Sequence, residues 1–66
     1  MSEQDQVVEI KFELRDEEAW AFAEFLKRVL PEDFERRAAS KAEANHMWDA
    51  GLEIQKALAD KGYAPR

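Results

Sequence analysis

Apolar and charged residues alternate over residues 7–14, which read VVEIKFEL. In an extended backbone this period of two places successive side chains on opposite sides. One side would carry Val8, Ile10, Phe12 and Leu14, and the other Val7, Glu9, Lys11 and Glu13. The pattern therefore predicts a half-buried β-strand over Val7–Leu14.

The predicted strand has no partner in the sequence, because no second run with the same alternation follows it. A lone strand leaves the backbone donors and acceptors along both of its edges unpaired. We therefore expect the segment to pair with its own copy across a two-fold axis, or to leave an open edge for a different protein.

From Arg15 to Leu30 the apolar spacing changes to that of an amphipathic helix. Asp16 stands where an N-cap belongs, and Pro31 ends the helix because it disfavours helical geometry in the residue before it. Trp20 and Phe25 lie off the apolar face, so each is either the edge of a broad core or an exposed contact for a partner. The predicted apolar face consists of Ala19, Phe22, Ala23, Leu26, Val29 and Leu30.

A second amphipathic helix is predicted from Ser40 to about Lys61. Its start, Ser-Lys-Ala-Glu, fits the capping box, and Gly62 follows as a stop signal. Gly51 lies on its apolar face, which predicts a close approach of the first helix. Between the two helices, Pro31 is suited to open a short helical turn that places Phe34 over the core.

Together these segments predict an α+β fold, with a single N-terminal strand, two main helices and a short helical turn between them. Residues 1–6 are expected to form a disordered tail, and residues 7–66 a single strand–helix–helix domain. The predicted core consists of Ile10, Phe12, Leu14, Phe22, Leu26, Val29, Met47, Trp48, Ile54 and Leu58.

The composition points to a small acidic protein. The chain has 66 residues, no cysteine and a net charge of −5. Residues 1–35 hold 11 acids and 4 bases, whereas residues 36–66 hold 4 acids and 6 bases. A negative field of this kind repels nucleic acid and anionic membranes and attracts basic surfaces. With no apolar leader in MSEQDQ and no run near the ~20 residues of a membrane span, we expect a cytoplasmic location.

The sequence contains little that would support catalysis. His46 is the only histidine, and its nearby carboxylates, without a second imidazole or a thiolate, make a weak metal set. Ser40 serves as a helix cap, and the two glycines do not form a phosphate-binding loop. We therefore expect no enzyme activity, no catalytic residue, no cofactor and no metal site.

The predicted order of strand, helix and helix resembles that of ribbon–helix–helix DNA-binding proteins in outline. In that family two strands pair into a ribbon whose outward side chains read the major groove. Here the outward positions include Glu9 and Glu13, which phosphate would repel. The connector of residues 31–39 is also longer than the short turn of that family. The resemblance therefore extends to the dimer and not to direct nucleic-acid reading.

Two further segments resemble a group of short bacterial proteins carried on chromosomes, plasmids and prophages. They are Asp16–Arg28, DEEAWAFAEFLKR, and the ending Gly62–Arg66, GYAPR. No activity is settled for that group. In size and charge the chain is also similar to anti-CRISPR proteins, small acidic proteins of mobile elements. That similarity implies an inhibitor that blocks a nucleic-acid-binding surface with carboxylates.

Two functions follow as hypotheses. The first is a non-catalytic acidic inhibitor that mimics nucleic acid and occludes a basic surface of a nucleic-acid-handling protein. The second is a homodimeric regulatory or antitoxin-like module, paired through Val7–Leu14, without direct DNA reading or membrane contact. The predicted partner-binding residues are Glu9, Glu13, Asp16, Glu17, Glu18, Trp20, Glu24, Glu32, Asp33 and Glu35.

Overall fold

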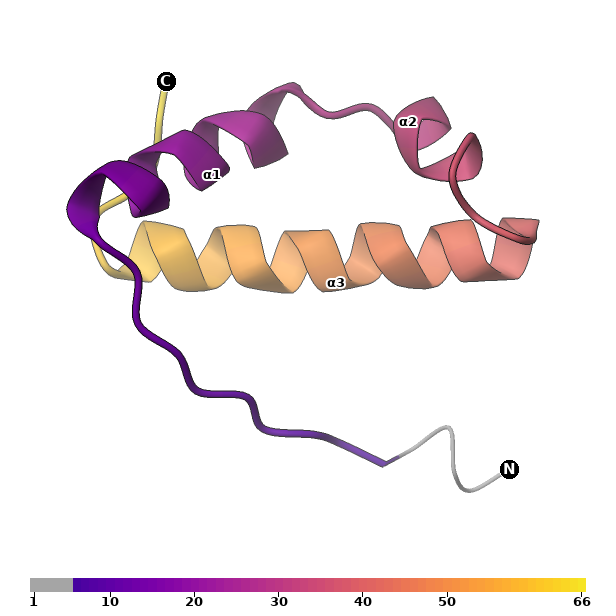
Figure 1. The fold of residues 1–66 in the computed structure, drawn as a ribbon, viewed down its shortest axis with the longest axis horizontal. Coiled ribbons are helices and arrows are strands. Elements are labelled where there is room, and N and C mark those ends of the chain that lie inside the picture. Colours follow the sequence, from indigo (N-terminus) through magenta and orange to yellow (C-terminus); the bar gives the residue numbers. More distant parts are fainter. Residues whose placement is uncertain (1–5) are drawn as a thin grey trace.

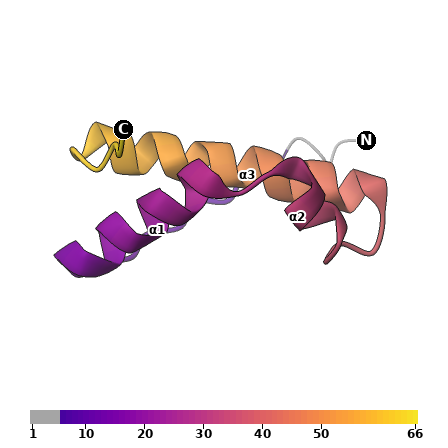
Figure 2. The same cartoon turned by 90° about the horizontal axis from the view of Figure 1, so that it is seen from above.

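The computed structural model describes residues 6–66 and contains three helices in that range. α1 spans Asp16–Arg28, α2 spans Pro31–Glu35 and α3 spans Lys41–Asp60. α1 and α2 both pack against α3, along one side of it, and α1 runs antiparallel to α3 (Figure 1). Seen from above, α1 and α2 follow one another along the length of α3 (Figure 2). Of the predicted disordered tail, residues 1–5 lie outside the described range.

The part of the chain from residue 6 onwards contains no strand, so the predicted α+β class and its N-terminal strand are wrong. The chain is all-helical, and residues 6–14 form an extended N-terminal arm whose residues are all exposed. A strand requires a ladder of hydrogen bonds to a second extended segment. Residues 6–66 offer none, so the alternating sequence produces an isolated arm that leaves the start of α1 and passes clear of the helices (Figure 1).

A charged side chain near its start and a proline after its end set the two ends of α1. The helix begins at Asp16, and Arg15, rather than the predicted Asp16, occupies the N-cap position. The Arg15 backbone N–H donates to Glu18 Oε1 over 2.9 Å. At the other end Val29 and Leu30 are extended, because Pro31 excludes helical geometry from the residue before it.

Pro31 opens α2, which confirms the predicted short helix. Proline suits this position because its fixed φ is helical and the N–H that it lacks would have no partner there. The Leu30 backbone N–H donates to Asp33 Oδ2 over 2.8 Å and so closes the start of the helix. Phe34 then packs its ring edge-on against Trp48 of α3, with 5.7 Å between the ring centroids. This aromatic contact joins α2 to α3.

α3 confirms the second predicted helix. Ser40 is its N-cap, and the Ser40 hydroxyl accepts the Glu43 backbone N–H over 3.1 Å. The Glu43 carboxylate reaches back one residue further than in the expected capping box, and accepts from Ala39 N–H over 2.6 Å. At the C-terminal end, Gly62 takes a φ of +98°. That left-handed conformation lets the chain turn back after the helix.

The core is small. Within residues 6–66 the buried apolar side chains are Ala19, Ala23, Leu26, Ala44 and Leu58. Of the predicted core, Leu26 and Leu58 are buried and Val29, Met47 and Trp48 are half-buried. Phe22 and Ile54 are exposed because they lie on the flanks of their helices, outside the narrow α1–α3 contact. Ile10, Phe12 and Leu14 are exposed because the arm that carries them runs away from the helices (Figure 1).

Gly51 faces α1, as predicted, yet the contact does not require a glycine. A Cβ added there would lie 3.6 Å from Leu26 Cδ2 and 3.8 Å from Phe34 Cζ, which are ordinary van der Waals distances. At Gly62 an added Cβ meets no atom within 4 Å, but the φ of +98° is strained for any other residue. The two glycines therefore have different physical roles.

The same substitution should change stability in opposite directions at these two sites. We expect Gly51→Ala to raise the free energy of unfolding by up to ~1 kcal/mol, because alanine favours the helix. We expect Gly62→Ala to lower it by about 1 kcal/mol, because alanine resists the left-handed conformation. Urea denaturation followed by circular dichroism measures both. A shift of the same sign in the two variants would contradict this account.

Candidate functional site

The predicted partner-binding residues fall into two groups on the structure. One group lies on the arm and α1, and the other, from Glu32 to Glu35, lies on α2. The start of α1 and helix α2 lie toward opposite ends of α3, so the structure does not gather these residues into one patch (Figure 1). The acidic residues of the arm and of the first turn of α1 form the larger group: Glu9, Glu13, Asp16, Glu17 and Glu18.

Two of the predicted carboxylates close the starts of their own helices. Glu18 accepts the Arg15 backbone N–H and also pairs with the Arg15 guanidinium at 3.0 Å. These hydrogen bonds, the backbone one first, lower the pKa of the Glu18 carboxyl below its ordinary value. Asp33 accepts the Leu30 backbone N–H and pairs with Arg36 in the same way. Both carboxylates therefore stabilise helix termini, which satisfies backbone groups that would otherwise lack a partner.

Three more carboxylates have partners within the molecule. Glu24 pairs with Arg28 at 3.0 Å, and Glu35 pairs with Lys41 at 3.1 Å. Asp16 Oδ1 accepts the hydroxyl of Tyr63 over 2.7 Å. The ion pairs are solvent-exposed and individually weak. Across residues 6–66 no hydrogen bond or ion pair engages the side chains of Glu9, Glu13, Glu17 and Glu32.

Trp20 lies at the edge of the packed helices, in contact with Tyr63. Its ring meets that of Tyr63 edge-on, with 5.0 Å between centroids and an interplanar angle of 68°. The residue nevertheless stays 41% exposed. The Asp16 carboxylate, which accepts the Tyr63 hydroxyl, raises the pKa of that phenol. Tyr63 thus holds the end of the chain against the start of α1 and supports one side of the indole.

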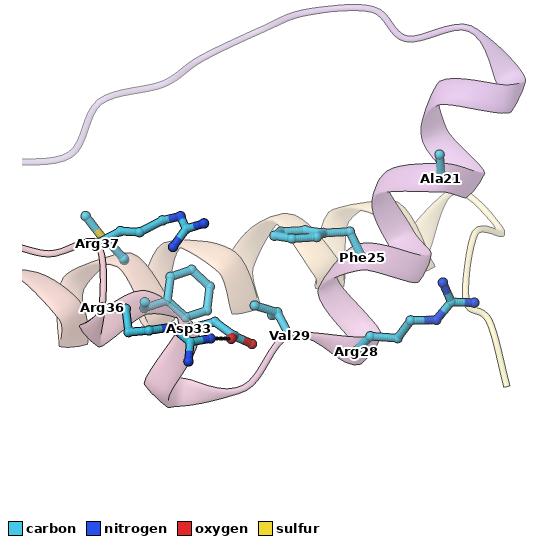
Figure 3. Close-up of a pocket in the computed structure, with 9 residues that line it drawn as sticks. Ala21, Phe25, Arg28, Val29, Asp33, Arg36 and Arg37 are labelled. Atoms are coloured by element: carbon cyan, nitrogen blue, oxygen red, sulfur yellow. Dashed lines mark hydrogen bonds and ion pairs between the residues drawn. The ribbon is translucent and has the colours of Figure 1, made fainter.

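A second surface, which the sequence did not reveal, is an open groove between α1 and α2 (Figure 3). Its volume is about 640 Å³, and its apolar wall is formed by Phe25, Val29, Phe34 and Met47. Three arginines line the same groove: Arg28, Arg36 and Arg37.

The arginines of the groove differ in their partners. Arg28 is paired with Glu24 and Arg36 with Asp33. No carboxylate pairs with Arg37 anywhere in residues 6–66. Of these two adjacent arginines, only Arg36 pairs with a carboxylate within residues 6–66. The groove arises because α1 and α2 pack one after the other on α3, so that Met47 of α3 lines the space between them. No local sequence pattern predicts this arrangement.

His46 is exposed on α3. Within residues 6–66 no three histidine, cysteine, aspartate or glutamate side chains lie close enough to hold a metal ion. The same part of the chain has no buried charged or polar residue. None of its helices combines the length and the apolar character needed to cross a membrane.

These features define a small three-helix protein with an exposed, extended arm and a core formed by few side chains. Residues 1–66 match the model of a family of unknown function, DUF7706, and the chain belongs to that family. This supports the resemblance to an uncharacterised group of small proteins. No curated protein and no solved structure matches the chain.

The Glu18 cap makes stability depend on pH in a defined direction. Because the pKa of Glu18 is lower in the folded protein, its hydrogen bonds stabilise the fold above the ordinary value of 4.5 and are lost as the pH falls through the lowered value. Glu18→Gln, which removes the charge, should therefore be less stable than the wild type at neutral pH. We expect that difference to shrink in acid.

Urea denaturation of wild type and variant from neutral to acidic pH tests this expectation. Glu17→Gln is the matched control, because Glu17 is the neighbouring acid and makes no hydrogen bond or ion pair within residues 6–66. A stability difference for Glu18→Gln that stays constant with pH, or that Glu17→Gln reproduces, would refute the role of the cap.

Proposed function

We propose that this protein is a non-catalytic inhibitor that mimics nucleic acid and occludes a basic surface of a nucleic-acid-handling protein. Its partner would be a protein such as a bacterial defence effector, and its origin a phage or other mobile element, as for anti-CRISPR proteins. The observation that carries the proposal is a row of carboxylates along the arm and the first turn of α1, namely Glu9, Glu13 and Glu17, which make no hydrogen bond or ion pair within residues 6–66. Charges arranged in this way attract a basic partner and direct its approach.

The proposed contact surface is narrower than the set predicted from the sequence. Glu9, Glu13 and Glu17 fall within nine residues and make no ion pair in residues 6–66. Trp20 lies three residues after Glu17, so the two side chains are neighbours on the surface of α1. A partly exposed tryptophan beside carboxylates is suited to anchor an interface that charge has brought together.

The carboxylates on α2 contribute less to this surface. Asp33 and Glu35 already face Arg36 and Lys41, so a basic partner would have to compete with these cations. Glu32 has no such partner in the described residues, but it lies on α2, away from the start of α1 (Figure 1). We therefore assign the attraction of the partner to the arm and α1.

Neutralising the row of carboxylates should weaken inhibition. We expect the triple variant Glu9→Gln, Glu13→Gln, Glu17→Gln to displace labelled nucleic acid from a host CRISPR effector about tenfold less well than the wild type, because three exposed charge pairs are lost. The control variant Asp49→Asn, Glu53→Gln, Asp60→Asn loses the same charge from α3. Fluorescence anisotropy at low and high salt measures the displacement.

The wild type should displace the nucleic acid better at low salt, because exposed charge pairs are screened by ions. Displacement of the nucleic acid that is the same at low and high salt would count against the proposed surface. An equal loss of displacement in the control variant would also count against it. Absence of displacement at low salt would count against inhibition of this class of partner.

A second candidate function is that of a homodimeric regulatory or antitoxin-like module without direct DNA reading. The observation that favours it is the N-terminal arm, where Ile10 is 73% and Phe12 63% exposed. Apolar side chains that alternate on one side of an extended, unpaired backbone are the features that another extended chain recognises. A second copy supplies such a chain.

Sedimentation velocity at tens of micromolar tests the dimer. We expect the wild type to be a dimer and the variant Ile10→Ser, Phe12→Ser to be a monomer, because that variant removes apolar contacts of the arm. Leu30→Ser, at an exposed apolar residue between α1 and α2 (53% exposed), is the control and should remain dimeric. A monomeric wild type, or a loss of the dimer in the control alone, would exclude pairing through the arm.

A further inference from the structure

We propose that two copies of the chain pair their N-terminal arms antiparallel, about a two-fold axis that passes beside Ile10. Ile10 then faces the partner's Ile10, Glu9 faces the partner's Lys11, and Val8 faces the partner's Phe12. This inference rests on the homodimer proposed above and specifies its geometry. The single chain stays all-helical, and the pairing belongs to the dimer.

The exposed surface of the chain is large enough for such an interface. Its accessible area is 5772 Å². A compact monomer of 7.7 kDa is expected to expose only about 4,300 Å². The excess is larger than the ~800 Å² per partner that a standard interface buries. Every residue of the arm is exposed, so the arm contributes to that area.

The alternation of the arm limits the registers that a symmetric pair can adopt. Apolar and charged side chains point to opposite sides, so a shift of one residue would place apolar residues opposite charged ones. The axis must therefore pass beside a residue and not between two residues. Near the middle of the arm the possible centres are Glu9, Ile10, Lys11 and Phe12. A centre on Glu9 would place Glu9 opposite the partner's Glu9, and this contact between like charges is unfavourable.

Charge excludes the register centred on Lys11. There Lys11 would face the partner's Lys11, and Glu9 would face the partner's Glu13. Like charges directly opposite one another destabilise an antiparallel pair. No contact between opposite charges on the same side of the paired arms would offset these two repulsions.

The register centred on Phe12 is limited by α1. It would place Val8 opposite the partner's Asp16, the first residue of α1, and Glu9 opposite the partner's Arg15. The Arg15 backbone N–H and guanidinium are already bonded to Glu18. Pairing would therefore stop before it used the whole arm.

The register centred on Ile10 meets neither obstacle. It pairs residues 6–14 along their full length and ends before α1 begins. Glu9 meets the partner's Lys11, and this favourable contact occurs twice because of the symmetry.

In this register the apolar side chains of both arms form one face, which consists of Val8, Ile10, Phe12 and Leu14 of each copy. A two-stranded pair is only marginally stable alone, so exposed apolar side chains of the helices are needed to cover this face, such as Phe22, Phe25 and Leu52.

Engineered disulfides test the register directly, because the chain contains no cysteine. Opposite residues of an antiparallel pair have Cα atoms ~4.5–5.5 Å apart, which suits a disulfide. In the proposed register the two Phe12 residues are four positions apart along the arms, about 13 Å, which is too far. We expect Ile10→Cys to form covalent dimers on mild oxidation, and Lys11→Cys and Phe12→Cys to form far fewer.

Exchange of the charges provides a second test. Glu9→Lys should weaken dimerisation about tenfold, because two Lys–Lys contacts replace two Glu–Lys contacts. Adding Lys11→Glu should restore it, whereas the register centred on Phe12 predicts no recovery. Glu17→Lys makes the same change in charge outside the arm and should leave dimerisation unchanged.

The outcomes separate the register from the dimer. Preferred cross-linking at Lys11 or Phe12 would overturn the register while the dimer stands. A dimer in sedimentation without cross-links at any of these positions would place the arm elsewhere, for example in the groove beside Arg37, and would overturn the pairing. A monomeric wild type would overturn both.

Discussion

The contact of α1 with α3 supports the rest of this molecule. Ala19 and Ala23 present small side chains to α3, so the two helices lie close together, with Leu26 and Leu58 filling the space between them. Tyr63 joins this cluster after the turn at Gly62 and is hydrogen-bonded to Asp16. A core of this size stabilises a fold only weakly, because the ordering of the chain opposes it with a term of similar size. Small folds with a weakly stabilising core are often stabilised by association with a second chain.

Carboxylates in this protein have two competing uses. Acidic residues at helix starts satisfy backbone N–H groups and interact favourably with the helix dipole, as Glu18 and Asp33 do here. A carboxylate used in this way contributes less to the attraction of a partner, since its charge is already opposed by a nearby arginine. A count of acidic residues therefore overstates the charge available for binding. The contacts of each carboxylate determine which ones remain. Within residues 6–66 three of these lie on the arm and α1, one on α2 and three on α3: Glu9, Glu13, Glu17, Glu32, Asp49, Glu53 and Asp60.

The arm and the groove, the two apolar surfaces of the molecule described above, differ in character. The arm presents apolar side chains on a backbone whose hydrogen bonds are unmet, and its flanking charges are self-complementary in an antiparallel arrangement. The groove between α1 and α2 presents aromatic and aliphatic side chains beside arginines, so it suits an apolar ligand that carries negative charge (Figure 3). The arm and the groove are therefore suited to different partners.

The two proposed functions, inhibitor and dimer, are compatible. Pairing of two arms would bring the carboxylates of both copies together and increase the negative field.

The sequence by itself determined the features that depend on neighbouring residues. Ser40 and Glu43 specify the start of α3, Pro31 ends α1 and opens α2, and Gly62 permits the final turn, because each acts within a few residues of backbone. The tertiary structure decided what depends on contacts between distant segments. Whether the alternation around Ile10 becomes a strand depends on a partner for its hydrogen bonds, and the described chain contains none. The exposure of Phe22 and the groove beside Arg37 depend on where the helices meet, which no local periodicity determines.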